Sequence, residues 1–422
     1  MILLQHHPKV PAIVRRMVAV SGDLADFFAF ILGQQVYHNT VHEQWEMDER
    51  IYHAPEKLDD SYEREFGGNA IERYRLTPER GEWVQRTDRC YAALSAPWKT
   101  GPRLFLREIP SERHLAVAWW DGSGHVNKAG IMIRRQEDSP SLTYLLGLLA
   151  SRSVHRYYMW TSEKSRQDLF PRISLRSVRQ LPIRIIDFEH PTEDGLKEEA
   201  LVCCREAIEA GDYDTPFVLA RAALAAHAAA HGPAGKPDLR DDEYWAEEIA
   251  WFEAEAGTVS VPPAGTEGGA GGRPPSDAAD LREDFVHDLL ASLAQRMIDL
   301  NAEKHEEKQG FLRWLERTLG CSIDDLSGKT LIRAYDERES IADFDDLCSR
   351  LCAAANRRKM SADPRGRDLQ EQIEGEYAAS VETLDELNAS LAATDALIDR
   401  IVYALYGLGE EEIAIIEGEE AE

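Results

Sequence analysis

The sequence has few cysteines and no long apolar run. Its 422 residues include six cysteines, too few and too scattered for the disulfide framework of a small secreted domain. No apolar stretch approaches the roughly 20 residues that a membrane-spanning helix needs, and the N-terminus lacks the pattern of a signal peptide. We therefore expect a cytoplasmic protein with reduced thiols and no membrane partner.

The sequence also lacks the motifs of self-sufficient catalysis. No Gly-x-Gly loop follows a predicted strand, so neither a dinucleotide nor an S-adenosylmethionine site is indicated. Gly328-Lys329-Thr330 resembles the end of a phosphate-binding loop, but Ile323 stands where that loop needs its first glycine. Cys348 and Cys352 have no partner pair, which favours buried thiols over a metal site. We expect no catalytic residue, bound cofactor or metal on this chain.

The charge is strongly negative but unevenly distributed. A formal net charge of −28 at pH 7 argues against a general nucleic-acid binder, because cationic contacts to phosphate dominate such binding. Residues 99–185 differ, with about 15 Lys and Arg against about 7 Asp and Glu. Aromatic residues are interleaved with these cations, as on the face of a protein that binds a polyanion. A solvated basic surface on an acidic protein is an equally good interpretation.

The apolar pattern predicts mixed helix and strand up to residue 186. Residues 9–20 have the stripe of a short helix, and 27–32 form an apolar run that ends at Gly33 and is typical of a strand. Residues 38–65 show weak periodicity and indicate a long loop with helical turns. Further strands are expected at 82–85, 103–109, 114–120 and 130–135, and helices at 141–150, with Ser141 near the N-cap, and at 154–160.

The remainder of the chain is predicted to be mainly helical. Ala-rich helices are expected at 193–210 and 216–231, an acidic helix at 241–256, and two long amphipathic helices within 281–308 and 366–406. The two long helices favour an antiparallel hairpin or a coiled pair.

This pattern predicts an α+β protein, with a mixed α/β domain followed by a mainly helical half. The expected parts are a mixed domain over 1–186, an acidic helical insertion over 187–256, a flexible Gly/Pro-rich linker over 257–280 and a helical domain over 281–422.

Several short motifs resemble a known family by their order and number. They are Gln34-Gln35-Val36-Tyr37, Arg50-Ile51-Tyr52-His53, the run from Gly67 to Tyr74, and the segments 102–109, 142–158, 169–173, 179–183 and 394–408. Together they resemble the TaqI-like C-terminal specificity domain, with the C-terminal helical region, of adenine-specific DNA methyltransferases and type IIG restriction–modification enzymes. The resemblance covers most of 25–185 and much of 281–416.

The resemblance implies recognition of a DNA target. Enzymes of this family also carry an N-terminal domain with a Gly-rich S-adenosylmethionine loop and an Asn-Pro-Pro-Tyr/Phe catalytic motif, and this sequence contains neither. The resemblance therefore implies the specificity part of a bacterial or archaeal system, which binds double-stranded DNA for a separate catalytic methyltransferase or restriction chain that holds S-adenosylmethionine. A truncated or decayed methyltransferase fragment and an interaction scaffold that does not bind DNA remain as alternatives.

Eight residues are predicted to contact DNA. Arginine on guanine and amide side chains on adenine are the favoured base contacts, while Arg and Lys on phosphates set the register. A polar loop at 162–167 and the Gly67-Gly68 turn, where the backbone can approach DNA closely, provide the sites. The predicted residues are Arg73, Tyr74, Arg107, Lys128, Lys164, Arg166, Gln167 and Arg172. For any single arginine, a surface salt bridge is the competing interpretation.

Overall fold

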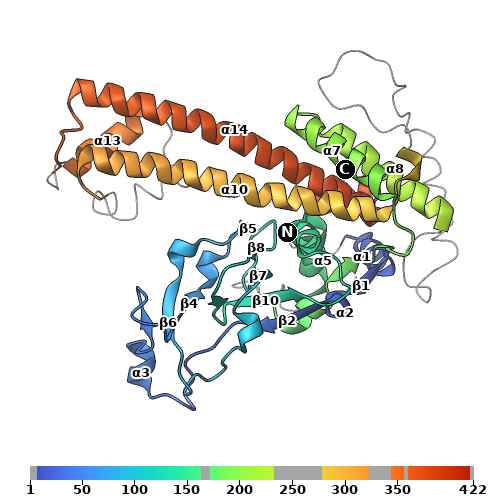
Figure 1. Ribbon diagram of the computed structural model, residues 1–422, viewed down its shortest axis with the longest axis horizontal. Coiled ribbons are helices and arrows are strands. Elements are labelled where there is room, and N and C mark those ends of the chain that lie inside the picture. The colour runs from blue at the N-terminus through green and yellow to red at the C-terminus, as the bar shows by residue number, and fades with distance from the viewer. Residues whose placement is uncertain (1–6, 163–171, 232–277, 323–343, 356–359, 419–422) are drawn as a thin grey trace. The chain divides into compact units, whose positions relative to one another are not determined.

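The computed structural model describes residues 7–162, 172–231, 278–322, 344–355 and 360–418. Strands occupy the N-terminal half and helices the C-terminal half (Figure 1), which confirms the predicted α+β class. The chain forms two compact units, residues 1–298 with 394–422 and residues 299–393. No described helix is long and apolar enough to cross a membrane.

Two sheets and a strand pair build the strand-rich half. The larger sheet has the order β2-β10-β7-β8-β5, and the smaller has the order β3-β6-β4-β9. The larger sheet consists of β2 (Phe28–Leu32), β10 (Gly130–Arg135), β7 (Arg103–Arg107), β8 (Val117–Trp120) and β5 (Tyr74–Arg75). The smaller consists of β3 (His53–Ala54), β6 (Glu82–Gln85), β4 (Tyr62–Phe66) and β9 (His125–Val126). Separately, β1 (Ser21–Asp23) pairs with β11 (Pro182–Arg184).

Neighbouring strands are antiparallel except for two pairs. Strands β5 and β8 are parallel, as are β4 and β9. In β7 and β10 the residues Leu104–Leu106 and Ile131–Ile133 are fully buried, because both faces of these central strands are covered. This explains why they appear in the sequence as continuous apolar runs rather than as an alternating pattern.

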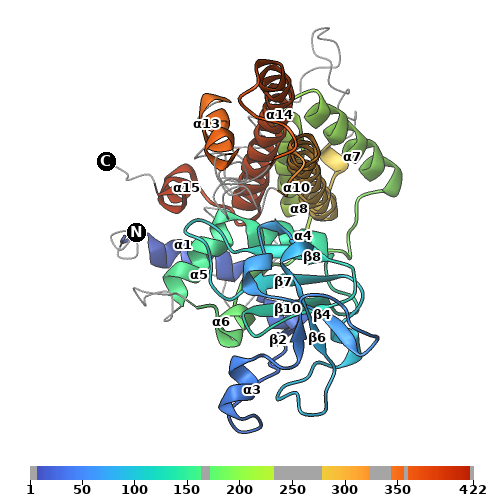
Figure 2. The same ribbon diagram turned by 90° about the vertical axis from the view of Figure 1, so that its left-hand side faces the viewer.

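Two short helices cover one face of the larger sheet. Helix α4 (Leu142–Ala150) packs on β7 and β8, and α5 (Arg152–Thr161) follows it directly (Figure 2). Ser141 caps α4 by accepting a hydrogen bond from Tyr144 N at 3.1 Å, as predicted, and Ser151 caps α5 in the same way. The other helices of this half are α1 (Val10–Ala19), α2 (Leu24–Phe27), α3 (Gln44–Asp48) and α6 (Leu175–Arg179).

The segment 38–65 differs from the predicted loop, since it contains α3, β3 and β4. Strand β4 is rich in charged residues, and its side chains are satisfied by pairing instead of by apolar burial. Glu63 accepts from Lys99 at 2.6 Å, and Glu65 is buried against two histidines. A strand of this kind has no apolar alternation for the sequence to reveal.

The helical half begins with α7 (Asp194–Glu209) and α8 (Asp214–His231) and continues with α10 (Glu283–Leu319), α13 (Phe344–Ala355), α14 (Arg367–Leu405) and α15 (Glu410–Glu417). The two predicted long helices are thus confirmed as α10 and α14. Within the unit 299–393 they lie antiparallel and share an apolar core with α13, including Leu315, Leu351 and Ile373. The predicted helix 241–256 and residues 257–277 of the predicted linker lie outside the described residues.

The compact units do not follow the expected boundaries at 186 and 280, because charged contacts join distant segments inside the larger unit. The buried Arg184 donates to Glu283 Oε1 at 2.6 Å. Arg73 donates to the carbonyl of Ala150 at 2.6 Å and to Asp395 at 2.6 Å. The amide of Arg152 donates to Asp399 Oδ1 at 2.9 Å. The end of α14 therefore belongs to the same unit as the two sheets.

Asp399 should give the larger unit a distinctive pH dependence. Burial and the neighbouring Asp395 carboxylate raise the pKa of Asp399 from 3.8 to about 7. The folded state then holds this proton more tightly than the unfolded state, so the contribution of Asp399 to stability falls as pH rises from about 4 to about 7. In Asp399→Asn, an oxygen still accepts from Arg152 but cannot ionise.

We expect D399N to gain stability relative to the wild type by up to about 1.4 kcal/mol per pH unit across that range. Urea unfolding at a series of pH values measures this difference. The exposed carboxylate of Asp121 provides a control, since Asp121→Asn should track the wild type at every pH. Parallel curves for D399N and wild type would contradict the expectation.

Candidate functional site

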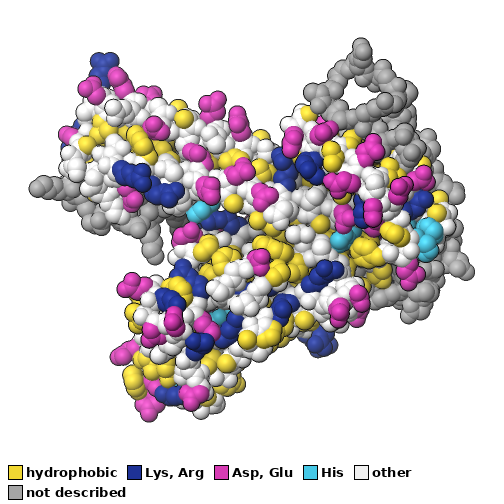
Figure 3. Space-filling view, in the orientation of Figure 1, with side chains coloured by type: hydrophobic (Ala, Val, Ile, Leu, Met, Phe, Trp, Pro, Cys, Tyr) yellow, Lys and Arg dark blue, Asp and Glu magenta, His cyan; other side chains and the backbone are white. Residues whose placement is uncertain are grey.

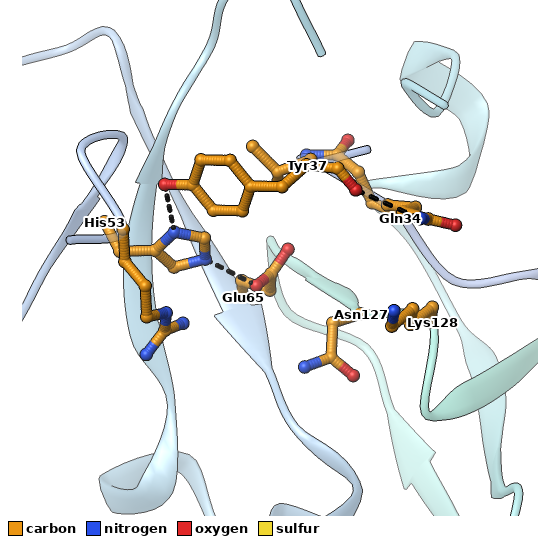
Figure 4. A pocket seen from close by; sticks show the side chains of 9 residues that line it. Gln34, Tyr37, His53, Glu65, Asn127 and Lys128 are labelled. Atoms are coloured by element: carbon orange, nitrogen blue, oxygen red, sulfur yellow. Dashed lines mark hydrogen bonds and ion pairs between the residues drawn. The ribbon is translucent and has the colours of Figure 1, made fainter. Parts of the chain in front are cut away.

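A pocket of about 140 Å³ lies where four separate segments of the strand-rich half meet. Figure 4 shows the side chains that surround it. The segment after β2, the residue Arg50, the strands β3 and β4, and the turn after β9 each contribute. The lining residues are Gln34, Gln35, Val36, Tyr37, Arg50, His53, Glu65, Asn127 and Lys128.

A tight turn between β9 and β10 forms one wall of the pocket. Gly130 N donates to Asn127 O at 3.0 Å, and Ala129 N donates to the side-chain Oδ1 of Asn127 at 2.9 Å. An asparagine that bonds to the backbone two residues ahead rigidifies such a turn. Lys128 therefore projects from an exposed position on a well-fixed loop.

The turn packs directly against the backbone that follows β2. Gly33 N donates to Gly130 O at 2.9 Å, and Gln34 N donates to Val126 O at 2.8 Å. A Cβ at residue 33 would overlap Asn127 O and lie 2.5 Å from Val126 O. Only glycine allows this approach. The contact fixes the position of Gln34 relative to Asn127 and Lys128.

A chain of hydrogen bonds forms the opposite wall. Tyr37 Oη lies 3.1 Å from His53 Nδ1, and His53 Nε2 lies 2.9 Å from Glu65 Oε2. Tyr37 Oη also accepts from the amide of Tyr52 at 2.8 Å. On the far side of Glu65, His125 Nε2 lies 3.5 Å from Oε1. These contacts hold the aromatic ring of Tyr37 and the imidazole of His53 in fixed orientations.

Glu65 is an ionised carboxylate beneath the pocket. Its side chain is only 4% exposed. Burial alone would raise the pKa of Glu65, but hydrogen bonds from His125 and His53 outweigh burial and lower the pKa to about 2. The carboxylate accepts these bonds from within the protein and is shielded from solvent.

Two cationic side chains, Arg50 and Lys128, line the pocket, and they differ in whether the protein already pairs them. Arg50 donates to both carboxylate oxygens of Glu82, at 3.0 and 2.5 Å. Lys128 Nζ has no hydrogen-bond or ion-pair partner in the part of the chain that the structure describes. The ammonium of Lys128 is therefore available to a ligand.

The structure places the predicted DNA contacts in different environments. Lys128 lines the pocket. Arg107 donates to Ile109 O at 2.7 Å, and burial lowers the pKa of its guanidinium. Arg172 is exposed and lies 3.8 Å from Glu108. Lys164, Arg166 and Gln167 lie outside the described residues.

Arg73 and Tyr74 are interior residues, contrary to the role expected of them. Tyr74 is 1% exposed, and Arg73 is held by Ala150 and Asp395. The Gly67-Gly68 turn that precedes them therefore turns the chain into the core. Tyr74 is thus closed to a ligand, and the Arg73 side chain, 20% exposed, is committed to the interior.

The cationic segment 99–185 is in large part structural. Arg103 is fully buried and donates to the carbonyls of Gly122 and Gly124. Lys99 pairs with Glu63, and Arg152 pairs with Asp399. Over the strand-rich half, Lys and Arg side chains are interspersed with Asp and Glu (Figure 3). Lys99 and Arg152 thus form salt bridges and Arg103 is bonded to backbone carbonyls, so the charge surplus overstates the number of available cations.

Only part of the pocket is foreseeable from the sequence. Gln34 to Tyr37 and Arg50 to His53 belong to the motifs of the family resemblance, but the eight predicted contacts include none of them. Their polarity directly after an apolar strand stopped by Gly33 was the available signal. Nothing in the sequence marks Glu65 or Asn127 as pocket residues, because the fold brings them together with residues that are distant in sequence.

Residues 63–183 match the family described as the TaqI-like C-terminal specificity domain. This segment is a TaqI-like specificity domain. The match confirms the resemblance for residues 63–183, and it includes Glu65, Asn127 and Lys128 of the pocket. Residues 286–402 match a second family, described as a domain of unknown function. No curated protein matches the chain.

Among solved structures, the chain is similar to the Type IIL restriction–modification enzyme MmeI in complex with DNA. The identity is 12% and the TM-score is 0.27, with 66% of this chain and 37% of that chain covered. The chain thus spans little more than a third of the length of that enzyme.

Replacement of Gly33 should test how the specificity domain holds its pocket. In Gly33→Ala the new methyl group would overlap the backbone of the 127–130 turn, so the turn must shift or the fold must strain. We expect the free energy of unfolding to fall by about 1–3 kcal/mol, measured by urea unfolding of the full chain. Gly195→Ala is the matched control, because its Cβ would meet only Glu193 Oε1 at 3.8 Å. If the two variants are equally stable, Gly33 is not required for the close contact with the 127–130 turn.

Proposed function

We propose that this chain recognises a specific sequence in duplex DNA for an adenine-specific DNA methyltransferase or type IIG restriction–modification system. The domain that binds S-adenosylmethionine and transfers the methyl group lies outside this sequence, on a catalytic partner. The process takes place in the cytoplasm of a bacterium or archaeon. The observation that carries this proposal is a TaqI-like specificity domain that contributes to a polar pocket, with Lys128 at the pocket edge unpaired among the described residues.

The chemistry of adenine methylation explains why such a domain is needed. The target adenine must leave the helical stack to reach a catalytic site. A separate lobe must then hold the flanking duplex and read its base edges. Reading requires hydrogen-bonding side chains held in fixed positions. The side chains of Gln34 and Asn127 are held in this way by bonds from Leu94 N and Ala129 N, and the turn fixes the backbone of Lys128.

The negative charge of the rest of the chain supports the same function. With a net charge of −28, most of the surface repels a phosphate backbone. Phosphate contacts are therefore confined to the few places where cations are not neutralised by carboxylates. This arrangement limits non-specific binding and favours one orientation on the duplex.

The full chain with its catalytic partner should bind duplex DNA in a salt-dependent manner. With three or four phosphate contacts, affinity should fall by roughly 40- to 150-fold between 50 and 200 mM salt. Gel shifts at the two salt concentrations measure this. Lys128→Glu should weaken binding at least tenfold, because it places a carboxylate at the interface, whereas Lys9→Glu on α1 should not.

Calorimetric titration of the isolated chain with S-adenosylmethionine should give no binding heat. Absence of duplex binding at low salt, both with and without the catalytic partner, would refute the proposal and favour an interaction scaffold or a decayed fragment.

A further inference from the structure

The pocket has hydrogen-bonding preferences that the proposed function does not specify. Resting on that function, we infer that the pocket reads a guanine in the major groove. Lys128 Nζ and Asn127 Nδ2 donate to the guanine O6 and N7 atoms. The ligand is thus a base edge with two adjacent acceptors.

The side chain of Asn127 can offer only its amino group. Its Oδ1 accepts from Ala129 N at 2.9 Å, which fixes the amide orientation and leaves Nδ2 without a partner among the described residues. Gly67 lies beside Asn127 Nδ2: a Cβ at residue 67 would stand 3.7 Å from this nitrogen. The absence of a side chain at Gly67 keeps this donor uncovered.

Lys128 supplies the second donor from the adjacent position of the same turn. Figure 4 shows Asn127 and Lys128 on the opposite side of Glu65 from His53. Nζ has three hydrogens, and no described residue competes for them. Gln34 adds a further donor, because its Oε1 accepts from Leu94 N at 3.3 Å and its Nε2 has no hydrogen-bond partner among the described residues.

Most of the strong acceptors around the pocket face the protein. Glu65 Oε2 is bonded to His53, Glu65 Oε1 is buried 3.5 Å from His125 Nε2, and Tyr37 Oη accepts from Tyr52 N. Gln35 uses its amino group on Tyr37 O at 3.0 Å, which leaves one amide oxygen as an available acceptor. Donors therefore predominate among the groups that a ligand can meet.

Guanine is the base that matches the two adjacent donors of Asn127 and Lys128 in the major groove. Guanine presents N7 and O6 side by side as acceptors, whereas adenine adds an amino donor, cytosine presents an amino donor, and thymine presents one acceptor beside a methyl group. Lysine on O6 and N7 is a favoured guanine contact.

A phosphate would fit the same donors less well. The ionised carboxylate of Glu65 lies at the base of the pocket and repels an anion there. A neutral guanine edge does not meet this repulsion. The experiment must therefore distinguish a contact of Lys128 with a phosphate from a contact with a base.

The test is selection from a randomised duplex library with the full chain and its catalytic partner. Three proteins are compared: wild type, Lys128→Met and Asn127→Asp. The aspartate retains the acceptor for Ala129 N and replaces the amino donor with an acceptor. Lys9→Met controls for the loss of one exposed positive charge away from the pocket, although Lys9 pairs with Glu411, and thermal unfolding confirms that each variant is folded.

We expect the wild type to select guanine at a position where K128M loses the preference by roughly 5- to 100-fold. N127D should lose the guanine or replace it with a base that presents an amino donor. The remaining positions should be unchanged. Replacing that guanine by 7-deazaguanine, which lacks the N7 atom that accepts from Asn127 Nδ2, should weaken the wild type and leave N127D unaffected.

Two results would overturn the inference while leaving the proposed function in place. The first is uniform weakening of all sequences by K128M with a smaller salt dependence, which identifies a phosphate contact. The second is selection by the wild type of a sequence that neither variant alters. If the wild type binds no duplex at all, the proposed function itself fails.

Discussion

The backbone contact between Gly33 and the turn from Asn127 to Gly130 determines the geometry of the pocket. Through this contact the end of β2 is bonded to the loop between β9 and β10, and Asn127 N in turn donates to Phe66 O at the end of β4 at 2.9 Å. Three segments that are distant in sequence thus share one set of backbone hydrogen bonds. These backbone hydrogen bonds position the side chains of the pocket, which come from short segments and not from a long helix or strand.

Such a backbone arrangement suits recognition because it reduces the entropy lost on binding. Side chains that are already oriented need not be ordered by the ligand. Asn127 is oriented by Ala129, Tyr37 by Tyr52, and His53 by Glu65. The mobile element at the pocket is the side chain of Lys128, whose backbone is nevertheless fixed by the turn.

Charges have two separate roles in this protein. Inside the larger unit, Arg73, Arg152 and Arg184 hold distant helices to the strand-rich half through buried or half-buried carboxylates. Removing one member of such a pair leaves the other buried and unpaired, which is costly. These arginines are therefore required by the fold. DNA recognition therefore depends on the smaller number of Lys and Arg side chains that are not paired inside the protein.

Sequence reasoning succeeded where local patterns carry the information. The apolar runs of β2 and β10, the cap at Ser141 and the periodicity of α14 were all visible, and the order of short motifs was enough to indicate the specificity domain. It missed β3 and β4, whose polar residues are satisfied across the fold. It also misplaced Arg73, because its partner Asp395 lies 322 positions further along the chain. Nothing near Arg73 distinguishes an interior arginine from an exposed one.

Hydrogen exchange of the chain with its catalytic partner, with and without bound duplex DNA, tests the central claim most directly. If the pocket faces DNA, amide and side-chain contacts there should slow exchange in residues 33–37 and 126–130 when duplex is added. The helices α7 and α8 should exchange at unchanged rates. Protection confined to those helices, with the pocket segments unaffected in a complex that has formed, would contradict the account.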